Sequence, residues 1–82
     1  MEIWKFSLVL GENRIAMPTG ARLLCAKIQH GTLRVWALVD RSHPAEAVEF
    51  FIVGTGETFN PVGCEYLDTV IDGHMVWHVW FR

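Results

Sequence analysis

The chain has 82 residues, of which 51% are hydrophobic, and its seven Lys and Arg against nine Asp and Glu give a formal net charge of −2. This size allows a single domain, residues 1–82, and the hydrophobic content excludes an intrinsically disordered chain. Basic residues are scattered among acidic ones, whereas a nucleic-acid-binding protein normally concentrates them in a patch. We therefore expect no direct nucleic-acid partner.

We expect no signal peptide and no membrane-spanning segment. No apolar run approaches the ~20 residues that span a bilayer. The N-terminal segment starts acidic and lacks a small-residue cleavage site. Two cysteines, Cys25 and Cys64, are too few for a disulfide framework. We expect a cytoplasmic protein with reduced thiols and no membrane partner.

The first predicted strand is IWKFSLVL, residues 3–10, in which apolar and polar side chains alternate. Four apolar residues share one face: Trp4, Phe6, Leu8 and Leu10. Turn-forming residues follow in GEN (11–13) and MPTG (17–20), and no strand is predicted between them.

Residues 21–40 predict a β-hairpin, ARLLCAKIQ-HG-TLRVWALVD, with a two-residue loop at 30–31. The register would place Leu24 opposite Ala37 and gather an apolar set on one face: Leu24, Ala26, Ile28, Leu33, Val35, Ala37 and Val39. The other face is mixed and includes Lys27 and Arg34. Because a slip of one residue would reverse both faces, this consistency supports the hairpin.

A fourth strand is predicted in AVEFFIV, residues 47–53, where Val48, Phe50 and Ile52 share one face. A second hairpin follows in EYLDTVI-DG-HMVWHVWFR, with Asp72 and Gly73 as a type I′ loop. These segments together predict an all-β fold of about six antiparallel strands in a strongly bent sheet, a small sandwich or a partly open barrel.

The second hairpin would pair Val70 with Met75 and Asp68 with Trp77, but both of its faces are half apolar. The register alone therefore does not tell which face is buried. If the last strand lies inside a sheet, Trp77 and Val79 fill the core, whereas Trp80 faces solvent or a partner.

The residue pattern does not favour catalysis or metal binding. His74 and His78 would be roughly 13 Å apart on a strand, too far for one zinc ion. Gly54-x-Gly56 lacks the third glycine and the following helix of a phosphate loop. Cys25 is expected within a strand as a packing residue. We expect no enzyme activity, no catalytic residues, no metal site and no cofactor.

The aromatic residues indicate a binding surface, because tryptophan and tyrosine are favoured anchors at protein interfaces. We expect this surface on the C-terminal hairpin, together with charged neighbours. The candidate protein-binding residues are Trp77, His78, Trp80, Phe81, Asp68 and Arg34.

The succession MPTGARLLCAKIQHGTLRVWALVD, FFIVGTGETF, YLDTV and HVWF resembles a family of small proteins of unknown function encoded by bacteriophages and prophages. The most specific part is WALVD followed by GTG. Twelve residues match the family pattern by position: Pro18, Gly20, Ala21, Trp36, Ala37, Leu38, Val39, Asp40, Gly54, Gly56, Tyr66 and His78. Asp68 departs from the glycine that this family often has before Thr69.

The resemblance implies a setting rather than a chemistry. Small phage proteins without an active site often block a host machine, and anti-CRISPR proteins are the leading example. The lead hypothesis is an inhibitor in the bacterial cytoplasm that binds a subunit of a host CRISPR–Cas effector complex. Two alternatives stay open: a phage assembly protein that self-associates, with a homodimer as one form, and an adaptor that binds a small ligand near the GTG loop.

Overall fold

A computed structural model describes all residues, 1–82, and contains seven β-strands and no helix. The strands are β1 (Glu2–Leu8), β2 (Gly11–Pro18), β3 (Arg22–Gln29), β4 (Thr32–Val39), β5 (Ala45–Gly54), β6 (Glu65–Asp72) and β7 (Met75–Phe81). The all-β prediction is confirmed, with seven strands in place of about six. Since the structure has no helix, none is long and apolar enough to cross a membrane.

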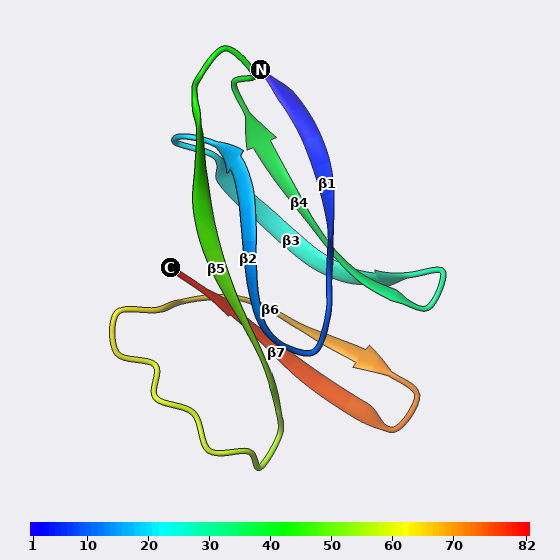
Figure 1. The fold of residues 1–82 in the computed structure, drawn as a ribbon. Helices are drawn as coiled ribbons and strands as arrows, with labels where there is room; N and C mark the ends of the chain where they lie inside the picture. The colour runs from blue at the N-terminus through cyan, green and yellow to red at the C-terminus, as the bar shows by residue number, and fades with distance from the viewer.

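The strands form two antiparallel sheets, and of the three predicted forms this is the small sandwich (Figure 1). Sheet A has the order β1-β4-β3, and sheet B has the order β2-β5-β7-β6. The chain passes from sheet A to sheet B between β1 and β2, and returns between β2 and β3. β7 therefore lies inside sheet B, between β5 and β6.

The core lies between the sheets and follows the alternation of the two central strands. In β4 every second residue is buried, and β5 does the same over its second half. Eleven buried hydrophobic residues form one cluster: Leu8, Met17, Ala26, Leu33, Val35, Ala37, Val39, Phe50, Ile52, Val70 and Val79. The predicted apolar faces of β4 and β5 are therefore confirmed.

The β3–β4 hairpin turns at His30 and Gly31, which both have positive φ (51° and 74°), as a type I′ turn requires. The predicted register holds from the loop to Cys25, where a β-bulge shifts it. The placement of Leu24 in the core was wrong, because Leu23 lies opposite Ala37 and Leu24 is 41% exposed.

The bulge has a physical reason. An uninterrupted ladder would place Arg22 opposite Val39, which is fully buried, and an unpaired charge there would be costly. The extra residue moves Arg22 opposite Leu38, on the outer side of sheet A. Leu23, rather than Leu24, then packs against the core.

The β6–β7 loop also differs from the prediction. Asp72 pairs with Met75, so the two loop residues are Gly73 and His74. Only Gly73 has positive φ, as the first position of a type II′ turn requires. Because the register differs by two residues, Val70 lies opposite Trp77, and between Asp68 and Asp72 the residues of each face remain together. Tyr66 lies opposite Trp80, on the other face.

β2 is the strand that the sequence reading missed. Gly11, Asn13 and Pro18 resemble turn residues, yet Gly11–Pro18 forms an edge strand along β5, with Pro18 at its end, where proline is tolerated. The turn itself lies just before this strand, at Val9. The Asn13 side chain accepts from the Val9 amide at 2.9 Å and donates to the Val9 carbonyl at 2.8 Å.

One side of the sandwich is closed by a seam between β3 and β6. The Asp68 carboxylate of β6 accepts from the Ala26 amide at 3.0 Å and from Lys27 Nζ at 3.1 Å. Asp68 also accepts from the amide of Thr69 at 2.8 Å. The edge strands of the two sheets are thereby joined through one side chain.

Candidate functional site

Four aromatic rings meet in a continuous row on the outer side of sheet B. Phe51 of β5, Trp80 of β7 and Tyr66 of β6 come from the sheet, and Phe59 comes from the loop between β5 and β6. Neighbouring ring centroids lie 5.9 Å apart for Phe51–Phe59 and 5.5 Å apart for both Phe59–Trp80 and Trp80–Tyr66. We call these four residues the aromatic face.

A second β-bulge brings Tyr66 to the aromatic face. The β6–β7 register shifts between Tyr66 and Asp68, which leaves Leu67 as the extra residue. Leu67 packs against the core, and Tyr66 lies opposite Trp80. An uninterrupted ladder would have placed Leu67 on the outer side and Tyr66 on the inner side.

A chain of hydrogen bonds runs beside the rings and orients His78. Tyr66 Oη lies 2.6 Å from Thr69 Oγ1, which lies 3.1 Å from His78 Nδ1. On the other side of the ring, His78 Nε2 lies 2.7 Å from Thr55 Oγ1. Each hydroxyl can donate or accept, so the chain satisfies both imidazole nitrogens. The imidazole is thus held in one orientation next to Trp80.

A charged pair borders the other end of the aromatic face. Arg82 Nε donates to Glu49 Oε1 at 3.1 Å, and the Arg82 guanidinium lies 5.1 Å from the centre of the Phe51 ring. The contact with Glu49 raises the pKa of Arg82 above its ordinary value. Glu12 of β2 lies opposite Phe51, so the rim of this surface contains acidic side chains.

The structure places the six candidate residues at four different locations. His78 and Trp80 lie on the outer side of sheet B, as the central position of β7 requires. Trp77 and Phe81 face the core, and the Phe81 ring lies 6.4 Å from the ring of Phe50. We expected that an inner position of the last strand would turn Trp77 and Val79 toward the core and Trp80 away from it. β7 lies inside sheet B, and this expectation is confirmed.

The two charged candidates lie away from His78 and Trp80. Asp68 belongs to the seam between the sheets, where burial favours a raised pKa, but bonds from the Ala26 amide, Lys27 and the Thr69 amide outweigh it and hold the pKa of Asp68 below its ordinary value. Arg34 lies on the outer side of sheet A and donates to Ser7 Oγ at 3.1 Å. The structure therefore does not bring the six residues together.

The GTG segment forms a closed turn. Glu57 folds back so that its amide donates to the Gly54 carbonyl at 3.0 Å and its carboxylate accepts from the Gly54 amide. Gly56 has a φ of +91°, a conformation that glycine adopts readily. The Gly54 amide, which would have to donate to a bound phosphate, already donates to the Glu57 carboxylate. This agrees with the interpretation of these glycines as turn residues.

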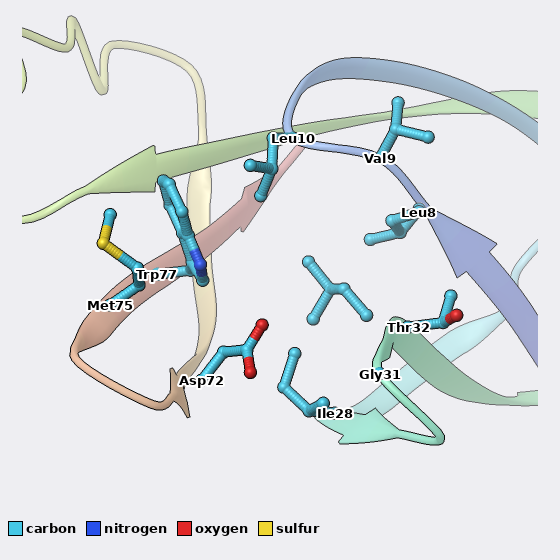
Figure 2. A pocket seen from close by; sticks show the side chains of 10 residues that line it. Leu8, Val9, Leu10, Ile28, Gly31, Thr32, Asp72, Met75 and Trp77 are labelled. Carbon is cyan, nitrogen blue, oxygen red and sulfur yellow. The ribbon is translucent and has the colours of Figure 1, made fainter.

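A hollow of about 510 Å³ opens at one end of the sandwich (Figure 2). Its wall includes Val9 and Leu10 from the β1–β2 corner, Ile28 from β3, and Met75 and Trp77 from β7. Val9 and Leu10 are 67% and 57% exposed. We call this region the open end.

A second hollow, of about 620 Å³, adjoins the open end through Met75 and Trp77. It extends to the GTG turn and is lined there by Thr55 and Glu57, with His74 on the other side. No three His, Cys, Asp or Glu side chains are close enough to one another to hold a metal ion.

The comparison with known families covers the whole chain. A family model described as "Domain of unknown function (DUF7352)" matches residues 1–82. The chain belongs to this family. No curated protein and no solved structure matches the chain. The predicted membership of a family of unknown function is therefore confirmed.

Sequence reasoning missed five members of the site: Phe51, Phe59, Tyr66, Thr55 and Thr69. The alternation in β5, with Phe50 inward, already indicated that Phe51 faces outward. Phe59 and Thr55 lie outside the strands, and their approach to Trp80 and His78 depends on the path of the loop between β5 and β6. No local pattern could have predicted that approach.

Proposed function

We propose that this protein is a non-enzymatic interaction protein that binds another protein through the aromatic face. The observation that carries the proposal is the row of four rings in mutual contact on an outer sheet surface. Tyr66 is 53% exposed, although it lies next to Trp80 in the row. Tryptophan and tyrosine at the centre of a surface are the side chains that most often dominate binding energy.

The arrangement would also reduce the cost of binding. Each ring is already held by its neighbour, and His78 is held by two hydroxyls. Ordering a mobile side chain costs about 0.5–1.5 kcal/mol on association, so side chains that are ordered before binding save this amount.

The specific partner that we propose is a subunit of a host CRISPR–Cas effector, with the protein acting as a phage-encoded inhibitor in the bacterial cytoplasm. The support is the sequence resemblance to small phage proteins and Glu12, which lies opposite Phe51 and has no ion pair. This carboxylate would complement a basic, DNA-binding surface of an effector, whereas Glu49 is already paired with Arg82. Covering such a surface would block DNA binding or nuclease recruitment without chemistry.

The test is capture of individual CRISPR effector complexes by the tagged protein, with phage plaquing on the same strains. We expect one effector to be captured and plaquing to be restored, and Trp80→Ala to abolish both. Trp4→Ala, which removes an exposed tryptophan on the β1 edge, is the matched control and should retain capture. Failure to capture any effector, or capture that Trp80→Ala does not weaken in a folded protein, would overturn the proposal.

A second candidate is self-association in phage assembly, and the open end favours it. Val9, Leu10 and Met75 expose apolar surface around a hollow, and exposed apolar patches often mark interfaces. Size-exclusion chromatography with light scattering distinguishes the two candidates. A dimer or larger assembly that Leu10→Asp dissociates would favour self-association, and a monomer at all concentrations would exclude it.

A further inference from the structure

The outer side of sheet A collects positive charge that is scattered in the sequence. Strand pairing places four basic residues there: Lys5 of β1, Arg34 of β4, and Lys27 and Arg22 of β3. Within the three strands the only acidic residue is Glu2, which lies opposite Val39 on the inner side, and Asp40 follows directly after β4. The rest of the chain keeps three basic and nine acidic residues, a formal charge of −6. We call this surface, with Trp36 at its centre, the basic face.

The cations of the basic face are largely unneutralised. Lys5, Arg22 and Arg34 have no carboxylate within ion-pairing distance, and only Lys27 is paired, with Asp68 at the seam. Lys5 Nζ donates to Gln29 Oε1 at 2.9 Å. Uncharged partners leave the positive charge available to an anion.

The four cations surround one aromatic side chain. Trp36 lies at the middle of β4, directly opposite Lys5 on one side and Cys25 on the other. Arg34 is two residues from Trp36 in one direction, and Arg22 lies opposite Leu38, two residues away in the other direction. Two residues along a strand span about 7 Å. The charges therefore lie within side-chain reach of a partly exposed indole.

We propose that the basic face binds single-stranded nucleic acid, with its phosphates on the cations and a base stacked on Trp36. Single strands are bound in this way on other sheets, by positive charge along the backbone and aromatic stacking of unpaired bases. A duplex hides its base faces, and this three-stranded surface has no helix that could enter a groove. An acidic protein would use the charges but would have no base to stack on Trp36.

This inference goes beyond the proposed function, since it concerns the opposite side of the sandwich. The expectation of no nucleic-acid partner relied on basic residues that are scattered along the chain. That premise does not hold for the folded protein, because antiparallel pairing and the bulge at Leu24 bring distant basic residues to one surface. The inference predicts binding that tests of the aromatic face would not detect.

The experiment is fluorescence anisotropy of the full chain with labelled dT20, U20 and a 20-base-pair DNA duplex. We expect both single strands to bind more tightly than the duplex. Three phosphate contacts, from the cations that have no ion pair, predict that binding weakens about 20-fold between 50 and 200 mM salt. Loss of stacking in Trp36→Ala should weaken binding about 5- to 150-fold, and Trp36→Phe should retain most of it.

Charge variants test the same surface without touching the core. Arg22→Gln and Lys5→Gln should each weaken binding and reduce the salt dependence by about one phosphate contact. The matched controls are Arg14→Gln, an arginine of sheet B that also lacks an ion pair, and Trp4→Ala. Both should bind as the unaltered protein does.

Three results would overturn the proposal. The first is no binding of dT20 or U20 at 50 mM salt. The second is equal binding of duplex, or of poly-glutamate, which would assign the surface to charge alone or to an acidic protein. The third is binding that Arg14→Gln weakens as much as Arg22→Gln, which would place it elsewhere on the molecule. If Trp36→Ala does not fold, the proposal is tested by Arg22→Gln and Lys5→Gln, which should weaken binding, and by Trp36→Phe, which should retain most of it.

Discussion

Removing the Asp68 carboxylate should loosen the joint between the two sheets. In Asp68→Ala the amide of Ala26, a fully buried residue, loses its acceptor across the seam. A buried donor without a partner costs about 1–3 kcal/mol, so we expect a loss of about 2 kcal/mol in the free energy of unfolding. For a domain of this size that loss lowers the Tm by about 8–16 °C.

Two variants separate the parts of this interaction. Asp68→Asn keeps an oxygen that can accept from the Ala26 amide, so it should lose less stability than Asp68→Ala. Lys27→Met removes the ion pair, in which the lysine is exposed, and should have the smallest effect. The measurement is urea unfolding followed by tryptophan fluorescence at neutral pH.

The pH dependence gives a second readout of the same site. The pKa of Asp68 is lowered in the folded protein, so its stabilisation is complete above the unfolded pKa of about 3.9 and is lost as the pH falls through the lower folded value. The stability difference between the unaltered protein and Asp68→Ala should therefore shrink below pH 4. Asp40, whose pKa is also lowered by bonds from Ser42, contributes equally to both proteins and cancels.

The reasoning is refuted if Asp68→Ala costs no more than Lys27→Met at neutral pH. That outcome would mean that the Ala26 amide does not depend on the carboxylate. A stability difference that stays constant down to pH 2 would also contradict it, because the protonated side chain should bind more weakly than the charged one.

The remaining predictions concern the core and the strand registers. Trp77→Ala should lower the free energy of unfolding by about 3 kcal/mol because this side chain packs against the core, as thermal unfolding would show. Gly54→Ala should cost about 1–3 kcal/mol in urea unfolding, since its new Cβ would lie 2.5 Å from Glu57 Oε1 and 3.1 Å from the Trp77 ring. Deleting Leu24, the extra residue of a bulge, should leave a cooperatively unfolding protein. Deleting Ala37 of β4, whose ladder with β1 has no bulge to absorb the loss, should abolish folding, because the side chains beyond the deletion would exchange faces. Circular dichroism on both deletions checks this, and equal stability would contradict the bulge.

Much of the fold could be predicted from local pattern. The alternation in IWKFSL, TLRVWALV and AVEFFIV predicted which residues of β1, β4 and β5 face the core, because side chains on a strand point to opposite sides in turn. The HG loop predicted a hairpin register that holds to Cys25. The turn signals also predicted a chain of short strands.

The errors share one physical cause. A strand whose pairing is decided by distant segments shows no reliable local signal, and the residues of β2 pair with residues of β5 that lie 27 to 41 positions later. Each bulge selects the pairing that is better for burial: the first keeps Arg22 on the outer side of sheet A, and the second lets Leu67 pack against the core. Leu24 and Leu67 could not be identified as extra residues before the partner strands were known.

The sequence by itself determined the all-β class and the core faces of the central strands. It also determined that Trp77 and Trp80 point to opposite sides of the sheet, given a β7 that lies inside it. These depend on a period of two residues, which is local. Only the tertiary structure decided the surfaces. Bulges and loop paths brought Tyr66 and Phe59 to Trp80, and strand pairing gathered scattered cations around Trp36, because side chains far apart in sequence become neighbours only when their strands pair.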